Sequence, residues 1–393
     1  MFNKINKDIR VVIGKLNSKN EIYTIFDKKI ILFLNEISKE ILKNREYRQF
    51  PDLIAFGFWC RLSNINSIFQ KYNFFKNRFG RGSILHISPS NVPTTFAYSM
   101  VFGLLSGNFN IVRLPSKNYF QIEILCKIFK KLSQKKSLKK IFNRFSLIRY
   151  ENSDLISSEL SKNVDGRIIW GGDRTVNKFK TFATKPRCVD IYFADKYSVS
   201  LIESNKLAKL NNRELKIMVQ KFYNDTYTMD QYGCSSPTSV FWLGKNNQAK
   251  KNFWNELATL VNNKYNFDFS GANKKITNIM DYVLKKKVRI NLGEFNLIKF
   301  QGNKKEFNQF KDINFGTFLE IDLASINHFK NFTSEKLQTV TYYGVEFERI
   351  KKFIFQNKIK GIDRIVPIGR AFELTSIWDG IDIIATLSRT ISD

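Results

Sequence analysis

Apolar residues recur every three or four positions between Glu21 and Lys43, and this spacing predicts a helix with one buried face. A second helix is predicted from Pro51, which suits a first helical turn, to Phe69. A basic segment from Tyr72 to Arg81 follows, and the pattern changes at Gly82. The chain therefore opens with a helical segment, for which we expect the bounds 1–79.

From Ser83 onward, short β-branched runs alternate with helical stretches. The predicted strands are Ile84–Ile87, Asn110–Leu114, Ser146–Tyr150 and Arg167–Trp170. The predicted helices between them are Thr94–Leu105, Tyr119–Leu132 and Asp154–Ser161. This alternation predicts a parallel sheet with helices on both faces, which is typical of a Rossmann-type cofactor domain.

A second α/β layer is predicted in the other half of the chain. Its predicted helices are Glu214–Tyr223, Gln248–Asn262 and Lys274–Leu284. Its predicted strands are Thr238–Leu243, Val288–Leu292, Asn296–Phe300, Thr317–Ile321 and Gln338–Tyr343. We expect a cofactor domain of residues 80–203 plus 367–393 and a second domain of residues 204–366, with the active site in the cleft between them.

Composition narrows the class of protein. The 393 residues are 43% hydrophobic, which is typical of a globular chain with sizeable cores. The net charge of +29 would suit nucleic acid, an anionic membrane surface or an acidic partner. The lysines are spread along most helices, however, and their densest run, Lys127–Lys140, carries only Phe129 as an aromatic and no zinc-finger, KH or RRM signature. We therefore do not expect a dedicated nucleic-acid-binding protein.

The cysteines and the apolar runs bear on the cellular compartment in which we expect the protein. Cys60, Cys126, Cys188 and Cys234 form no C-x-x-C pair, which argues against a disulfide framework or a zinc site and suits a reducing cytoplasm. Residues 1–16 contain no signal-peptide core, and the longest apolar run, Phe96–Leu105, is about half of the roughly 20 residues that span a bilayer. We expect a cytoplasmic, metal-independent protein that does not cross a membrane.

Polar turns follow three of the predicted strands. They are Ser88-Pro89-Ser90-Asn91-Val92-Pro93, Arg113-Leu114-Pro115-Ser116-Lys117 and Gly171-Gly172-Asp173-Arg174-Thr175. Ordinary loop chemistry would explain any one of them. Because ligands bind at the carboxyl ends of parallel strands, three such turns together predict a cofactor site.

Cys234 lies in a Gly-Cys-Ser-Ser-Pro connection between a predicted helix and a predicted strand. There a thiolate could act as a nucleophile, although a lone cysteine is more often a small buried hydrophobe. Cys60, Cys126 and Cys188 fall in apolar patterns and are interpreted as packing residues. His86 falls inside a strand and is interpreted as a core residue, so the general acid stays open.

Taken together, these segments resemble the aldehyde dehydrogenase superfamily. Ile87–Pro93 is similar to the motif whose asparagine, here Asn91, helps to build the oxyanion hole, and Cys234 stands where the superfamily has its nucleophile. The tail segments Gly361–Arg370 and Ile377–Gly380 resemble the acyl-CoA reductase family of bacterial bioluminescence (LuxC type). The resemblance extends from about Gly80 to the end of the chain.

The resemblance implies an aldehyde dehydrogenase-like fold and an NADPH-dependent reduction of a fatty acyl-CoA to the aldehyde through an acyl-cysteine. It implies Cys234 and Asn91 as catalytic residues. It implies the following cofactor-binding residues: Ser88, Pro89, Arg113, Lys117, Gly171 and Gly172. It also leads us to expect a homo-oligomer and an acyl-transferring or acyl-activating partner protein.

One departure from the superfamily bears on the product. Aldehyde-oxidising members carry a catalytic glutamate upstream of the cysteine, whereas the corresponding segment here, Arg187–Phe193, contains none. Hydrolysis of an acyl-enzyme needs a base that activates water. The absence of this glutamate therefore favours a reductase. Two alternatives stay open. One is a reductase of another activated acyl group, such as an acyl phosphate or a carrier-protein thioester, and the other is a non-catalytic polyanion-binding protein.

Overall fold

The structure is a computed structural model, and it describes residues 8–16, 21–72, 77–266, 269–286, 295–310 and 314–391. The chain divides into two compact units. The first unit combines Met1–Asp195 with Leu374–Asp393, and the second is Lys196–Glu373. Among the helices of the described ranges, none has the length and apolar character that crossing a bilayer requires.

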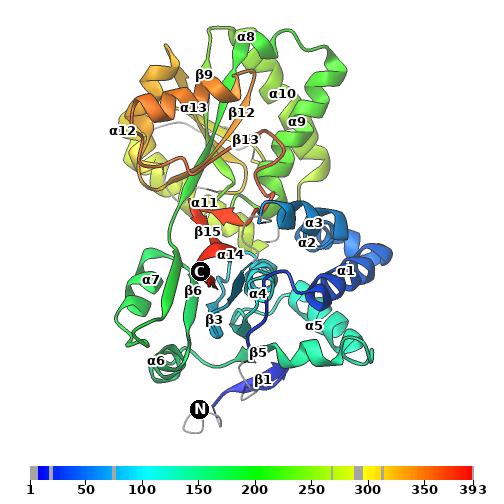
Figure 1. The fold of residues 1–393 in the computed structure, drawn as a ribbon. Helices are drawn as coiled ribbons and strands as arrows, with labels where there is room; N and C mark the ends of the chain where they lie inside the picture. Colours follow the sequence, from blue (N-terminus) through cyan, green and yellow to red (C-terminus); the bar gives the residue numbers. More distant parts are fainter. Residues whose placement is uncertain are drawn as a thin grey trace. The chain divides into compact units, whose positions relative to one another are not determined.

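The first unit is built on a six-stranded sheet in the order β1-β5-β4-β3-β6-β7 (Figure 1). The strands are β1 (Arg10–Ile13), β3 (Ser83–Ile87), β4 (Phe109–Arg113), β5 (Phe145–Arg149), β6 (Gly166–Trp170) and β7 (Val189–Phe193). All of them run parallel except β1, which pairs antiparallel with β5. The chain leaves β3 in one direction and returns through β6 on the other side of it. The sheet is therefore a Rossmann-type sheet with its switch point between β3 and β6, which confirms the predicted fold class.

Helices cover both faces of this sheet. They are α4 (Thr95–Leu105), α5 (Phe120–Ser133), α6 (Asp154–Asn163) and α7 (Asp173–Lys180). On one face, Leu85 and Ile111 of the sheet pack with α6 and α7 in a single core cluster. On the other face, Phe33 of α1 (Lys28–Lys43) contacts Phe129 of α5 and Phe145 of β5.

The opening helices differ from the prediction in two ways. The first begins at Lys28, not at Glu21, because the Asp27 side chain accepts the backbone N–H of Lys29 at 2.9 Å and caps it there. The predicted second helix is two helices, α2 (Pro51–Trp59) and α3 (Leu62–Gln70). They separate at Arg61, whose ψ of 142° is extended.

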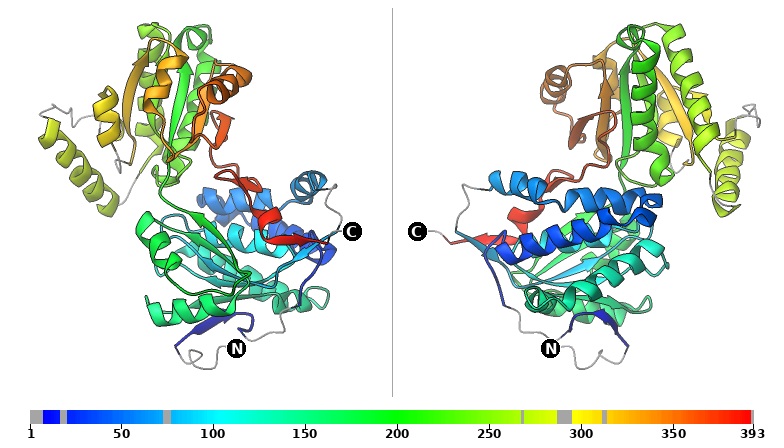
Figure 2. Two further views of the ribbon diagram at one scale, coloured as in Figure 1. Left: turned by 60° about the vertical axis from the view of Figure 1, so that its left-hand side comes forward. Right: turned by 90° about the vertical axis from the view of Figure 1, so that its right-hand side faces the viewer.

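The end of the chain completes the first unit. The strand β16 (Ser388–Thr390) pairs antiparallel with β2 (Arg78–Gly80). The short helix α14 (Ile383–Thr386) packs on α4, and Ile383, Ile384 and Leu387 are fully buried. The hairpin β14 (Ile377–Trp378) and β15 (Ile381–Asp382) precedes it, and Figure 2 shows this returning segment in red.

The second unit is a six-stranded, fully parallel sheet in the order β10-β11-β9-β8-β12-β13. Its strands are β8 (Tyr197–Glu203), β9 (Pro237–Leu243), β10 (Ile298–Gln301), β11 (Thr317–Leu323), β12 (Leu337–Tyr343) and β13 (Arg364–Pro367). Since β8 pairs with β9 and β12, this unit begins at Lys196, before the expected boundary at Glu203. The predicted strand Val288–Leu292 lies outside the described residues.

Two helices cover one face of the second sheet, α9 (Asn212–Thr226) and α10 (Asn247–Lys264), and bury Phe222 and Phe253 against Trp242. The helix α13 (Phe347–Gln356) packs on the other face with Phe241 and Phe329. The right-hand view of Figure 2 shows α9 and α10 on the opposite side of the sheet from α13. The remaining helices are α8 (Ser204–Leu207), α11 (Phe269–Lys286) and α12 (Lys304–Gln309).

Candidate active site

The turn that carries Cys234 is held in an unusual backbone conformation. After α9 and one turn of 3₁₀ helix, Asp230 and Gln231 adopt φ of 51° and 59°, in the left-handed region that side chains other than glycine rarely enter. The buried Gln231 side chain fixes this turn, because it accepts the N–H of Gly316 at 2.7 Å and donates to the Pro237 carbonyl at 3.0 Å. Neighbouring chain segments thus stabilise a strained turn at a site candidate.

Cys234 follows this turn, directly before β9, and is half-buried. Its carbonyl accepts a hydrogen bond from the Ser198 hydroxyl at 2.7 Å, and its Sγ accepts one from the Gln338 side-chain amide at 3.1 Å. Cys234 is thus partly exposed, and hydrogen bonds reach both its backbone carbonyl and its sulfur. Cys234 is thus not enclosed in a core, unlike Cys60 and Cys126, which are buried.

Gln338 was not predicted as part of the site. The pattern predicted only a strand from Gln338 to Tyr343, which the resemblance placed near the nicotinamide ribose. In the structure, the register between β12 and β8 shifts between Leu337 and Thr339, so Gln338 is the extra residue of a β-bulge. No signal in the sequence marks that bulge.

Arg364, in the segment Gly361–Arg370, binds several backbone carbonyls of the loop that follows it. Arg364, on β13, donates to the carbonyls of Arg370 at 2.9 Å, Ala371 at 2.5 Å and Glu373 at 2.5 Å. Burial lowers the pKa of Arg364 to about 10, against the raising effect of Glu373, Asp225 and Cys234. Cys234 therefore lies within range of the guanidinium charge.

A buried carboxylate holds the same loop from the other side. Asp225, on α9, accepts the backbone N–H groups of Gly369 at 2.6 Å and Ala371 at 2.9 Å. The loop in turn places Phe372 so close to Gly233 that a Cβ there would lie 2.6 Å from the ring. A side chain at position 233, directly before Cys234, would therefore have to displace the Phe372 ring.

The first sheet brings the predicted cofactor residues to its carboxyl edge. The loop after β3 contains Ser88, Pro89 and Asn91, and it lies at the switch point. The Ser88 hydroxyl is buried and has no hydrogen-bond partner within the described ranges, whereas Asn91 is exposed. A buried hydroxyl without a partner at a switch point fits a ligand that would satisfy it.

Arg113 and Lys117 follow β4, the neighbour of β3. The Arg113 guanidinium lies over the Tyr150 ring at 4.4 Å, and the Lys117 ammonium lies 4.9 Å from the centre of the Tyr119 ring. Both cations stand on the same edge of the sheet as Ser88. These residues fit a phosphate-bearing dinucleotide.

Gly171 and Gly172 lie between β6 and α7, but their surroundings are acidic. The Asp195 carboxylate accepts the N–H of Asp173 at 2.9 Å, and a Cβ on Gly172 would lie 3.2 Å from it. A Cβ on Gly171 would lie 3.0 Å from the Thr175 side chain. A side chain at either position would therefore press on Thr175 or Asp195, and the Asp195 carboxylate already accepts an N–H from the first turn of α7.

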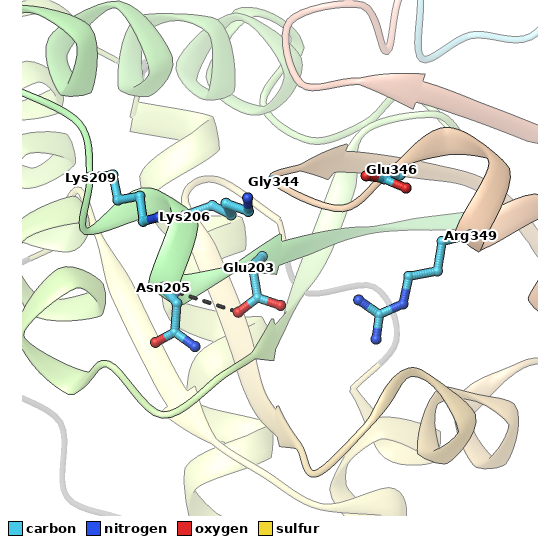
Figure 3. A pocket seen from close by; sticks show the side chains of 7 residues that line it. All are labelled: Glu203, Asn205, Lys206, Lys209, Gly344, Glu346 and Arg349. Atoms are coloured by element: carbon cyan, nitrogen blue, oxygen red, sulfur yellow. Dashed lines mark hydrogen bonds between the residues drawn. The ribbon is translucent and has the colours of Figure 1, made fainter.

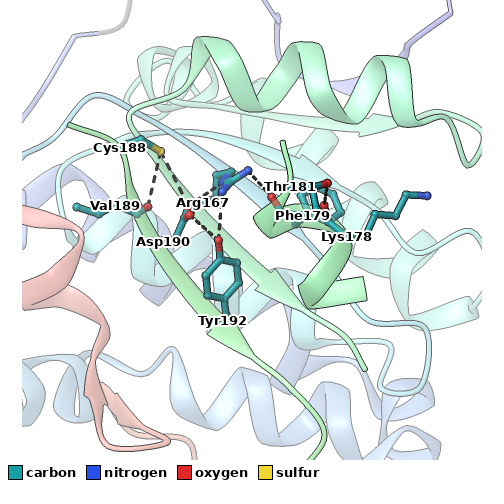
Figure 4. Close-up of polar contacts among 8 residues, drawn as sticks. All are labelled: Arg167, Lys178, Phe179, Thr181, Cys188, Val189, Asp190 and Tyr192. Carbon is teal, nitrogen blue, oxygen red and sulfur yellow. Dashed lines mark hydrogen bonds and ion pairs between the residues drawn. The ribbon is translucent and has the colours of Figure 1, made fainter. Parts of the chain in front are cut away.

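The segment that lacks a glutamate is a structural cluster (Figure 4). Arg167 is only 2% exposed and binds both carboxylate oxygens of Asp190, at 2.7 and 2.6 Å. The Tyr192 hydroxyl donates to the same carboxylate at 2.5 Å. Although burial raises the pKa of Asp190, the hydrogen bonds from Arg167 and Tyr192 outweigh it and lower the pKa. Asp190 thus has a structural role, and its oxygens are already engaged.

Two of the three other cysteines are buried as predicted, Cys60 and Cys126, whereas Cys188 is half-buried beside Asp190. Burial and the Asp190 charge raise the pKa of Cys188 to about 11, so its thiol stays protonated. His86 is fully buried between Ser99 and Asn110, each at 2.8 Å. Burial lowers its pKa to about 4, which confirms a core residue and excludes it as an acid.

The second unit also has a hollow of about 370 Å³ at the carboxyl ends of β8 and β12 (Figure 3). It is lined by Glu203, Asn205, Lys206, Lys209, Gly344, Glu346 and Arg349. Cys234 precedes β9 and therefore lies at the amino edge of the same parallel sheet. This hollow and Cys234 therefore lie at opposite edges of the second sheet.

No group of three or more His, Cys, Asp or Glu side chains within the described ranges is arranged to hold a metal ion. A search of curated protein sequences returns no match. Many solved structures share the fold.

Among these structures are two dehydrogenases and one protein described as an oxidoreductase. A mutant form of the 1-pyrroline-5-carboxylate dehydrogenase of Thermus thermophilus is 9% identical, with a TM-score of 0.64 over 93% of this chain and 81% of that one. An oxidoreductase from Marinobacter aquaeolei is 11% identical, with a TM-score of 0.65 over 95% and 87%. The glyceraldehyde-3-phosphate dehydrogenase GapN of Methanocaldococcus jannaschii, complexed with NADP, is 11% identical, with a TM-score of 0.63 over 92% and 88%. The fold is therefore that of the aldehyde dehydrogenases.

The sequence itself matches one family model, described as acyl-CoA reductase (LuxC), over residues 63–294. This range includes Asn91 and Cys234 and covers more than half of the chain. The tail segments lie beyond it. The chain belongs to the acyl-CoA reductase (LuxC) family, and it is an oxidoreductase of acyl or aldehyde groups.

Proposed function

We propose that this protein reduces an acyl-CoA thioester to the aldehyde with NADPH, through a covalent acyl group on Cys234. The observation that carries the proposal is the half-buried Cys234 thiol, which lies in a strained turn with an amide donor at 3.1 Å. Family membership supports the acyl substrate, and the NADP complex of GapN supports the cofactor.

The chemistry divides into two steps. The Cys234 thiolate attacks the thioester carbonyl, the bond to the CoA sulfur breaks, and CoA leaves as a thiolate that takes a proton from solvent. Bound NADPH supplies a hydride to the acyl carbon. The resulting thiohemiacetal oxyanion re-forms the carbonyl as its carbon–sulfur bond breaks, which releases the aldehyde and restores the Cys234 thiolate. Because the returning group is a thiolate, this collapse needs no separate general acid.

The chain's own residues have two further tasks in this proposal. The Asn91 amide and the Cys234 backbone N–H hold the oxyanion, a role worth about 10²–10³ in rate for one donor. Ser88, Pro89, Arg113 and Lys117 hold the cofactor, together with the Gly171-Gly172 turn. We further propose that the protein is cytoplasmic, forms a homo-oligomer and receives acyl groups from an acyl-transferring or acyl-activating partner.

The test is acylation without cofactor. Incubation with a fatty acyl-CoA should add one acyl mass, and Cys234→Ala should abolish the adduct. Cys188→Ala is the matched control, because Cys188 is also half-buried but is expected to stay protonated at neutral pH. An adduct that survives in Cys234→Ala would overturn the assignment.

The product decides between a reductase and an aldehyde dehydrogenase. With NADPH and acyl-CoA, the aldehyde should form and free acid should be a minor product, since Asp190 is engaged by Arg167. In reverse, oxidation of the aldehyde should require CoA. Rapid CoA-independent acid formation would contradict this proposal. Acylation by acyl phosphate or a carrier-protein thioester, but not by acyl-CoA, would reassign the substrate.

A further inference from the structure

We infer that Gln338 is a catalytic residue whose side-chain amide stabilises the thiolate form of Cys234. This inference deepens the proposed function, since it concerns how the same thiol becomes reactive. The starting point is a direct contact, in which Gln338 Nε2 lies 3.1 Å from Cys234 Sγ. A hydrogen bond given to the charged form of an ionisable group favours that form.

The backbone delivers Gln338 to this position. β12 pairs with β8, and their register places Leu337 opposite Tyr197 but Thr339 opposite Ser198. The extra residue, Gln338, is turned out of the regular alternation of side chains by this bulge. The same bulge brings the Thr339 N–H to Ser198 Oγ at 3.1 Å, and Ser198 Oγ donates to the Cys234 carbonyl. One irregularity therefore positions both Gln338 and Ser198, each of which hydrogen-bonds to Cys234.

The orientation of the amide is also set locally. Thr339 Oγ1 donates to Gln338 Oε1 at 3.2 Å, which leaves the Nε2 group to face the sulfur. Gln338 is only 1% exposed, so water competes little for its donor. A buried amide in a fixed orientation donates to the thiolate at little entropic cost.

The surrounding charge favours the same ionised state. Arg364 is opposite Thr339 in the β12–β13 register, and the Cys234 charge raises the pKa of Arg364. The interaction is mutual, so the guanidinium charge favours a thiolate at Cys234. Glu373 and Asp225 act on the same guanidinium. The site thus combines a nearby cation with a directed donor, two features that activate cysteines.

Stabilising the thiolate matters twice in the proposed reaction. It raises the fraction of Cys234 that can attack the thioester, and its lost proton passes to solvent. It also makes Cys234 a better leaving group when the thiohemiacetal collapses. No general base is required in either step.

The test is the pH dependence of alkylation of Cys234 by iodoacetamide, followed by peptide mass spectrometry. Gln338→Met keeps the length of the side chain and removes the donor. Alkylation at neutral pH should become about tenfold slower, and its midpoint should move about one unit to higher pH, since a tenfold change corresponds to one unit. Gln301→Met, on the exposed end of β10, is the control and should leave the profile unchanged.

A second variant guards against a folding defect. Gln338→Glu keeps the shape of the side chain but presents a carboxylate to the sulfur, so the profile should move further to higher pH than in Gln338→Met. Circular dichroism and thermal melting establish that each variant is folded. An unchanged profile in a folded Gln338→Met or Gln338→Glu variant would overturn the inference.

The readout separates this inference from the proposed function. Alkylation requires neither acyl-CoA nor NADPH. A shifted profile in a protein that is never acylated would keep the role of Gln338 and remove the proposed function. Normal acylation with an unshifted alkylation profile would keep the proposed function and remove the role of Gln338.

Discussion

Asp225 illustrates how one buried carboxylate can link pH to stability. Burial raises its pKa to about 7, although Gly369 and Ala371 donate to it. Because this value lies above the ordinary 3.8, the folded state holds the proton more tightly than the unfolded chain does. The resulting stabilisation is complete below about pH 4 and is lost as the pH rises to about 7. Three units correspond to roughly 4 kcal/mol.

Asp225→Asn cannot ionise, so it should lack this component. Between about pH 4 and pH 7, the free energy of unfolding of the unmodified protein should fall relative to that of the variant, by up to roughly 4 kcal/mol. Urea denaturation at a series of pH values measures both curves. Parallel curves would show that Asp225 is already ionised throughout this range.

Arg113 and Lys117 carry the expected preference for NADPH. Replacing both with Ala should weaken binding of NADPH about tenfold and leave NADH unchanged, because only NADPH has a 2′-phosphate for a charge-assisted hydrogen bond. Titration of cofactor binding measures both affinities. Lys130→Ala is the control, since Lys130 is an exposed cation on α5 of the same unit. Equal losses for both cofactors would mean that Arg113 and Lys117 do not read the phosphate.

The structural setting of two single residues was predicted correctly from the local pattern. Cys234 follows a turn, and His86 is a core residue, as the sequence indicates. Gln338 was missed because its contact with the thiol depends on a bulge in β12. Cys188 lies in an apolar pattern but is half-buried, because its strand neighbour Asp190 faces a polar cluster.

At the scale of elements, β-branched runs identify most strands, and β3, β4, β6, β9 and β11 lie where the pattern predicts them. The strand β8 was not predicted because it contains Ser198 and Ser200, polar residues that are fully buried. Each has a partner across the sheet, since Ser198 Oγ accepts from Thr339 and Ser200 bonds to Thr341 at 2.7 Å. The two serines interrupt the continuous apolar run that a buried parallel strand usually shows.

The strand β1 was missed for a different reason. It lies at the edge of the first sheet and pairs antiparallel with β5. Such pairing is set by tertiary structure, and a four-residue run, Arg10–Ile13, is too short to show a period.

The returning elements α14 and β16 should be essential to the first unit. A chain that ends at residue 373 would lose the buried side chains of Ile383, Ile384 and Leu387 and would leave the edge of β2 unpaired. We expect it to melt at least ~10 °C lower or to aggregate, because burial of each such side chain contributes about 1.5–3 kcal/mol. A chain that ends at residue 390 is the control and should melt normally. Equal melting of the two shortened chains would contradict this expectation.

At the scale of the whole molecule, both units use parallel sheets, but the candidate residues lie at different edges. Ser88 and Arg113 lie at the carboxyl edge of the first sheet, and Cys234 lies at the amino edge of the second. The general rule that ligands bind at the carboxyl edge of parallel strands therefore applies to Ser88 and Arg113 and not to Cys234. Cys234 is indicated instead by the Gly-Cys-Ser-Ser-Pro connection in which it lies.

The path of the chain also has a consequence for its synthesis. The second unit is one continuous stretch, Lys196–Glu373, inserted into a first unit that is completed by the returning elements α14 and β16. On the ribosome, domains usually fold in the order in which they emerge. Here β2 is synthesised before the inserted unit, and its partner β16 is synthesised after it. The edge of β2 that pairs with β16 therefore stays exposed while residues 196–373 are synthesised.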